Sequence, residues 1–172
     1  LRGIIITVAG EQVADDNVVD VIKSAVLKGC LSTFTTANTT MVNAASTAET
    51  MGLPVTANIT GAVDSSSAFT NKLKVQFLFD DDVEASLEGT VLAGAGMRIT
   101  RVGDLAVACP PGEHMIFFEN TDQPGVLLRL ADVLGNADIN IENFSLGRTE
   151  KNGRAIGCLV IDRPCSETVM AK

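Results

Sequence analysis

The most constraining feature of this sequence is a polar turn, residues 120–127, between an apolar strand and an apolar helix. The strand covers residues 114–118, and Pro124 and Gly125 stand inside the turn. Pro suits the first helical position because its missing N–H has no partner there, so the pattern predicts a helix that opens at Pro124. The free N–H groups of such a first turn, at the positive end of the helix dipole, suit a small carboxylate.

Side chains that can hold an ammonium group flank this predicted helix. Asp122 precedes the helix, and Asn140 stands at the start of the next strand. Together with the N–H groups of the first turn, they are the parts needed to bind an amino acid, and the sequence nearby offers no groups to transform it. Structural roles remain open, because Asp122 is also suited to cap the helix, for about 1 kcal/mol, and Asn140 to form a polar turn.

Composition excludes several classes of function. A chain of 172 residues allows one or two small domains. Its formal charge of −8 makes nucleic acid and anionic membranes poor default ligands. No apolar run approaches the roughly 20 residues of a membrane span. The 4 cysteines have no C-x-x-C spacing and His114 is the single histidine, so we predict no metal site and no catalytic residue.

The order of apolar patterns predicts an α+β chain with a boundary at residues 110–112, Pro-Pro-Gly. Before the boundary we expect a strand, two helices with an extended or loop segment between them at residues 32–40, a hairpin and two further strands. They are predicted at residues 4–8, 18–29, 41–51, 72–79, 84–91, 97–102 and 105–109. After the boundary we expect a strand, a helix, strands near residues 140–146 and 155–161, and a last helix from about Ser166.

The turn and the Asn140 segment resemble the ACT domain, an amino-acid-sensing βαββαβ module. Segments upstream resemble, in order, the allosteric substrate-binding domain that precedes the ACT domain in long-form D-3-phosphoglycerate dehydrogenases. They are residues 4–8, 42–44, Glu49, 52–55, 89–91 and 98–103. The resemblance covers most of the chain. It implies a mixed-sheet α/β regulatory domain at residues 1–110 and a ferredoxin-like ACT domain at residues 111–172 that lacks its last strand.

The resemblance also implies an effector site. In the dehydrogenase ACT domain, the positions of Asn120, Asp122 and Asn140 contact L-serine, and the N–H groups of Val126 and Leu127 would receive its carboxylate. Asn120 departs from the family, which often has an aromatic residue or His at this position. The family site lies between two ACT domains, which implies a homo-oligomer.

A second, anion-binding site is implied for a phosphate-like group. Arg98 and Arg101 are its candidates, since a guanidinium suits phosphate or carboxylate. Neutral residues, Leu105 and Pro110, stand where the family has other basic residues. An Arg exposed to solvent at a strand edge explains either position equally well.

We therefore expect a regulatory fragment of D-3-phosphoglycerate dehydrogenase, for oligomerisation and feedback inhibition by L-serine. The parent would use NAD, but this chain has no G-x-G-x-x-G motif, so we expect no cofactor here. A cytoplasmic location is expected, with an organellar presequence left open because the chain starts at Leu1. Two alternatives are the accessory (beta) subunit of an iron–sulfur L-serine dehydratase and a non-enzymatic ACT sensor. The dehydratase subunit should carry a Gly-Pro-Ser-Ser-Ser-His-Thr-like stretch, which is absent.

Overall fold

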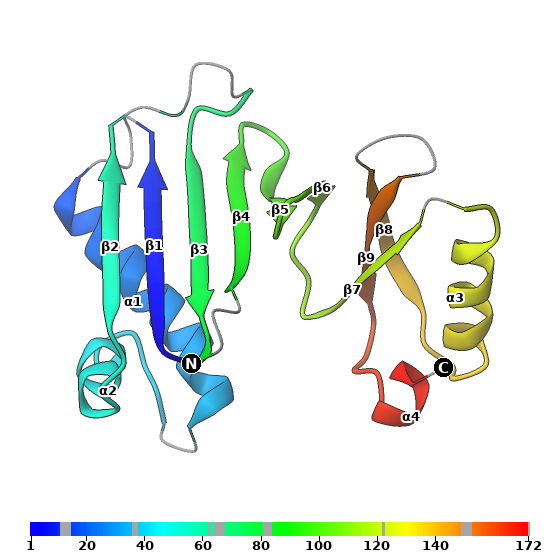
Figure 1. Ribbon diagram of the computed structural model, residues 1–172, viewed down its shortest axis with the longest axis horizontal. Coiled ribbons are helices and arrows are strands. Elements are labelled where there is room, and N and C mark those ends of the chain that lie inside the picture. Colours follow the sequence, from blue (N-terminus) through cyan, green and yellow to red (C-terminus); the bar gives the residue numbers. More distant parts are fainter. Residues whose placement is uncertain are drawn as a thin grey trace. The chain divides into compact units, whose positions relative to one another are not determined.

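The computed structural model describes residues 1–10, 15–35, 38–61, 63, 68–80, 84–121, 123–148 and 153–171. They form two compact units, Leu1–Val91 and Leu92–Lys172. Each unit has its own sheet strands and its own helices (Figure 1). Along the described part of the chain, no helix combines the length and the apolar character that a membrane span requires.

The first unit is built on a mixed sheet. Its strands lie in the order β2-β1-β3-β4, with β1 parallel to β2 and antiparallel to β3, and with β3 antiparallel to β4. The strands are β1 (Gly3–Ala9), β2 (Val55–Thr60), β3 (Lys72–Leu78) and β4 (Glu84–Leu92). The predicted first strand and the predicted hairpin are thereby confirmed, and so is the mixed-sheet α/β fold.

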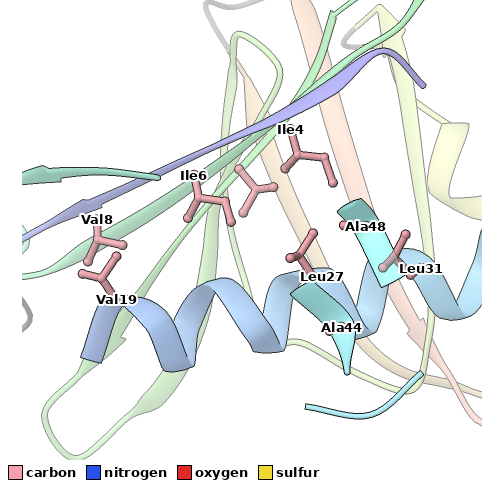
Figure 2. Close-up of a cluster of buried hydrophobic side chains, with 9 residues drawn as sticks. Ile4, Ile6, Val8, Val19, Leu27, Leu31, Ala44 and Ala48 are labelled. Atoms are coloured by element: carbon pink, nitrogen blue, oxygen red, sulfur yellow. The ribbon is translucent and has the colours of Figure 1, made fainter. Parts of the chain in front are cut away.

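Two helices, α1 (Asp16–Phe34) and α2 (Ala44–Thr50), enclose an aliphatic core with β1 (Figure 2). Alternate residues of β1 point to the same side of the sheet, which brings three of its apolar side chains to the helices. The fully or almost fully buried members of this cluster are Ile4, Ile6, Val8, Val19, Leu27, Leu31, Ala44, Ala48 and Val75. Since the core has no aromatic member among these residues, its stability rests on close aliphatic packing.

Helix α1 begins as the sequence indicates and ends later. The Asp15 side chain caps it by accepting a hydrogen bond of 2.9 Å from the Asn17 N–H. The prediction of a loop from Ser32 was wrong, because the helix continues to Phe34. The buried Leu31 side chain anchors this extra turn in the core, and the Ser32 hydroxyl donates to the Gly29 carbonyl at 2.8 Å. Tertiary packing thus outweighs the polar local sequence.

The second unit contains a hairpin followed by a βαββα segment. The three-stranded sheet has the order β7-β9-β8, and both pairs are antiparallel. The elements are β5 (Gly96–Val102), β6 (Leu105–Cys109), β7 (His114–Thr121), α3 (Val126–Gly135), β8 (Ile141–Arg148), β9 (Arg154–Ile161) and α4 (Glu167–Met170). This order confirms the ferredoxin-like prediction. The predicted boundary at residues 110–112 stays a prediction.

The central strand β9 is buried on both faces. Toward α3, its Leu159 and Ile161 pack with Leu134 and Ile139. On the opposite face, Ile156, Cys158 and Val160 are also buried. There β6 lies against β8 and β9, and the residues of β6 alternate between buried and exposed. The sheet therefore lies between α3 and the β5–β6 hairpin.

The core of the first unit gives a matched test on one helix. Val19 is 5% exposed and Val21 is 60% exposed. Val19→Ala removes two buried methyl groups, so we expect it to lower the free energy of unfolding by about 2 kcal/mol. Val21→Ala should change it by less than about 0.5 kcal/mol. Urea denaturation of both variants is the measurement, and equal losses would contradict the assignment of this core.

Candidate functional site

At the start of α3, the N-cap residue Gly125 offers no side chain to cap the backbone N–H groups of the first turn. The helix begins at Val126, not at Pro124 as predicted, because Gly125 adopts a left-handed conformation with φ of 89° and forms the N-cap. The first helical hydrogen bond runs from the Arg129 N–H to the Gly125 carbonyl at 3.1 Å. Helix α3, all of whose residues the structure describes, has no acidic side chain in its first turn. The N–H groups of Val126 and Leu127 therefore point from a positive helix end without an anionic neighbour in that turn.

A cavity of about 160 Å³ opens beside this helix start. Its lining joins the beginning of α3 to the ends of β7 and β8, and most of its side chains are apolar. The lining residues are Phe118, Asn120, Gln123, Gly125, Val126, Leu127, Phe144 and Leu146. The structure thus brings together three of the predicted effector residues, Asn120, Val126 and Leu127. Asp122, the fourth of them near this turn, lies outside the described residues.

Asn120, which lines this cavity, carries a buried acceptor. Its amide nitrogen donates to the Thr121 carbonyl at 2.7 Å, which fixes the orientation of the amide. Its Oδ1 is buried and accepts no hydrogen bond from the part of the chain that the structure describes. A buried acceptor without a partner costs on the order of 1–3 kcal/mol. A ligand that donates an O–H or N–H here would remove that cost.

Asn140 lies at the other end of the same sheet. Its N–H donates to Asp162 Oδ1 at 2.9 Å, and its carbonyl accepts from the Asp162 N–H at 3.1 Å. The neighbouring Ile141 pairs with Ile161, whereas Asn120 pairs with Ala155 at the opposite end of β9. An eight-residue strand spans about 23 Å between its first and last residues. Asn140 and the cavity therefore do not meet within one chain.

The two candidate anion-binding arginines lie on β5. Arg98 Nη1 donates to the Met97 carbonyl at 2.7 Å, and Arg101 Nη1 donates to the Asp104 carbonyl at 2.7 Å. Both guanidinium groups are therefore bonded to the backbone close to their own positions. The structure does not place either arginine in the cavity lining.

An ion-pair cluster that the sequence did not reveal joins three segments of the second unit. Arg154 binds both carboxylate oxygens of Asp104, at 2.5 and 3.2 Å, and Glu119 Oε1 at 2.5 Å. The guanidinium lowers the pKa of both carboxyl groups, chiefly through these hydrogen bonds. The acids also raise the pKa of Arg154, Glu119 contributing first. Partners separated by 35 and 50 positions give no local sequence signal.

Five lining residues were not predicted as site residues: Phe118, Gln123, Gly125, Phe144 and Leu146. Alternation along a strand could have indicated Phe118, because it shares a face with Asn120. A second cavity of about 290 Å³ lies between α3, β7 and α4, and apolar side chains form most of its lining. Among the described residues, no group of three or more His, Cys, Asp or Glu side chains is arranged to hold a metal ion.

Two family models match this chain. Residues 1–103 match the D-3-phosphoglycerate dehydrogenase intervening domain, and residues 114–171 match the ACT domain. The D-3-phosphoglycerate dehydrogenase of Bacillus subtilis (strain 168) is 28% identical over 149 residues, 87% of this chain and 28% of that protein. The enzyme of that name from Synechocystis is 29% identical over 148 residues, 86% of this chain and 26% of that protein. The chain thus spans less than a third of the length of these relatives.

A weaker match concerns a different enzyme. The L-serine dehydratase beta chain of Peptoniphilus asaccharolyticus is 22% identical over 99 residues, which is 58% of this chain and 45% of that protein. Its identity to this chain is lower than that of the two dehydrogenases, and the match covers a smaller part of the chain.

The buried Asn120 oxygen leads to a stability test. Asn120→Leu replaces a buried acceptor, to which no described residue donates a hydrogen bond, by an apolar side chain of similar size. We expect the free energy of unfolding of the unligated chain to rise by about 1 kcal/mol. Asn120→Asp, which keeps an oxygen acceptor in place, should not stabilise the chain. Denaturant titration of both variants is the measurement, and a loss of stability in Asn120→Leu would contradict the arrangement.

The contact between Asn140 and Asp162 gives a pH test. The Asn140 N–H, followed by the Arg163 guanidinium, lowers the pKa of Asp162. Because the folded pKa lies below the unfolded value of about 3.9, the stabilisation is complete above that value and disappears as the pH falls through the folded pKa. Relative to Asp162→Asn, the wild type should therefore lose its stability advantage between about pH 5 and pH 2. Asp132→Asn, at an exposed position of α3, is the control. If the wild type loses as much stability in acid relative to Asp132→Asn as it does relative to Asp162→Asn, the assignment is wrong.

Proposed function

Because the chain belongs to the family of the D-3-phosphoglycerate dehydrogenase intervening domain and carries an ACT domain after it, we propose that it is the regulatory region of such a dehydrogenase in serine biosynthesis. The parent enzyme would oxidise 3-phosphoglycerate with NAD, through residues outside this chain. The chain itself would bind L-serine and transmit feedback inhibition.

The observation that supports the proposal is that one cavity has both hydrogen-bond donors and a buried hydrogen-bond acceptor. The start of α3, where the N-cap Gly125 has no capping side chain, offers N–H donors at a positive dipole end, while Asn120 offers a buried acceptor. A free amino acid is a zwitterion that needs both kinds of partner at once. The cavity lining that the structure describes contains no nucleophile or titratable group, which favours binding over catalysis.

In this arrangement the serine carboxylate accepts from the N–H groups of Val126 and Leu127. The sequence places Asp122 beside Pro124 and Gly125, where its carboxylate would hold the ammonium group. Asn120 Oδ1 accepts from the serine hydroxyl or from the ammonium. The apolar walls exclude water and strengthen these charge-assisted hydrogen bonds.

A second copy of the chain would complete the site with its own Asn140. ACT domains generally bind amino acids and mediate oligomerisation, and two features here favour association. Leu127, Leu128 and Leu146 are exposed at the cavity end of the unit. Strand β8 is at the edge of its sheet, where unpaired backbone groups favour pairing with another strand. An effector held between two copies would favour one arrangement of them over others, as feedback regulation requires.

A phosphate-like anion at Arg98 and Arg101 remains a separate proposal, since guanidinium groups suit such anions. The accessory subunit of an L-serine dehydratase is the second candidate function. The match with a dehydratase beta chain favours it, although that match covers much less of the chain.

Calorimetry with L-serine tests the site. A charge-assisted contact is worth about 1.5–3 kcal/mol, so Asp122→Asn and Asn140→Ala should each weaken binding about tenfold or more. Arg98→Ala should leave the affinity unchanged. If wild type binds no L-serine, or if both site variants bind it at wild-type strength, the proposal is wrong.

Mixing the two variants that bind L-serine weakly distinguishes a site formed within one chain from a site shared between two copies. If Asn140 acts on the neighbouring copy, a hybrid dimer of Asp122→Asn and Asn140→Ala has one intact site. An equal mixture should then recover wild-type affinity in about a quarter of all sites. No recovery after subunit exchange would show that Asn140 does not act across the interface.

A further inference from the structure

The β5–β6 hairpin contacts the ACT-domain sheet on the face opposite the proposed effector cavity. Strand β6 lies against β8 and β9, and its alternate residues Leu105, Val107 and Cys109 are buried. On β9, the buried residues of the face away from α3 are Ile156, Cys158 and Val160. We call this arrangement the docked hairpin.

The docked hairpin depends on a backbone contact at Gly147. A Cβ atom built on this glycine would overlap the carbonyl oxygen of Ala106 in β6. No other residue type can therefore occupy position 147 while the hairpin remains docked. Along the same contact between hairpin and sheet, Cys109 of β6 and Cys158 of β9 are both fully buried, and a Cβ atom on Gly112 would overlap Val160.

Arg154 adds ion pairs at one end of the contact between the hairpin and the sheet. It binds Asp104, in the turn between β5 and β6, and Glu119, on β7. The groups are exposed, so solvent screens the ion pairs, but the paired contact with Asp104 fixes the geometry of the turn.

The proposed cavity occupies the same end of the same strands. Glu119 lies between Phe118 and Asn120, which line the cavity, and Gly147 follows Leu146, which also lines it. Neighbouring residues of a strand point to opposite faces. The cavity therefore lies on one face of β7 and β8, while Gly147, which contacts the hairpin, and Glu119, which is joined to it through Arg154, lie on the other face. A ligand that fixes these strand ends also fixes Glu119 and Gly147.

We infer that L-serine in this cavity stabilises the docked hairpin, which makes the hairpin the element that responds to effector binding. The inference rests on the proposed function of the cavity. Strand β5 begins at Gly96, shortly after β4 ends at Leu92, so the response of the hairpin reaches the segment that joins the two units in the chain. By linkage, if L-serine favours the docked state, the docked state must bind L-serine more tightly by the same factor.

Thiol labelling of the 172-residue chain measures docking directly. Burial, and to a smaller extent the Cys109 thiol, raises the pKa of the Cys158 thiol to about 12. Because the thiolate is the reactive form, Cys158 reacts slowly while the hairpin is docked. Labelling with N-ethylmaleimide and peptide mass spectrometry would follow Cys109 and Cys158. Cys30, in the first unit, is the internal reference. We expect saturating L-serine to slow labelling of Cys109 and Cys158 about fivefold or more and to leave Cys30 unchanged.

Two variants and one control sharpen the test. Gly147→Ala should label quickly with or without L-serine, because its methyl group prevents docking. Its affinity for L-serine should fall by the same factor by which L-serine slows labelling in wild type. Arg154→Gln introduces no clash and should label faster than wild type while remaining sensitive to L-serine. Gly135→Ala, where a built Cβ atom has no neighbour within 4 Å, should behave as wild type.

The outcomes separate the two proposals. If L-serine binds wild type but labelling of Cys109 and Cys158 does not change, the hairpin inference is wrong and the proposed function stands. If Gly147→Ala labels as slowly as wild type, docking does not depend on the backbone contact at Gly147. If wild type does not bind L-serine at all, both proposals fail.

Discussion

The second unit depends on the burial of strand β9 on both faces. Helix α3 covers one face and the β5–β6 hairpin contacts the other, so residues 155–161 must be apolar throughout. Gly157 shows how tight this packing is, because a Cβ atom there would overlap the ring of Phe118. That ring also lines the proposed cavity. The packing of the central strand therefore sets the position of one wall of the site.

The sequence predicted elements whose signals are local. Alternation identified the hairpin of β3 and β4, and helical spacing identified α1 and α3. The prediction failed where tertiary contacts or an unusual backbone conformation determine where an element begins or ends. Leu31 extends α1 through a segment that looks like a loop, and Gly125 delays α3 because its left-handed conformation is not helical. Nothing local to β9 or β6 indicates that one covers the other.

The geometry of the candidate site could be predicted only in part. Asn120, Val126 and Leu127 do meet, because a strand end and the following helix start are close in the chain. Asn140 follows the same helix at its other end, and the length of α3 carries it away from the cavity. The aromatic and aliphatic walls come from β7 and β8, which are adjacent to β9 and not to each other. Such neighbours become visible only once the strand order is known.

The left-handed Gly125 has a consequence for the balance between stability and ligand binding. Ser, Asp or Asn at an N-cap usually stabilises a helix by about 1 kcal/mol, through an oxygen that accepts from the first turn. Here such an oxygen would compete with a ligand carboxylate for the same N–H groups, and a side chain at φ of 89° would be strained. Gly125 therefore does not supply this stabilisation. In the proposed complex, the effector carboxylate itself becomes the missing N-cap of α3.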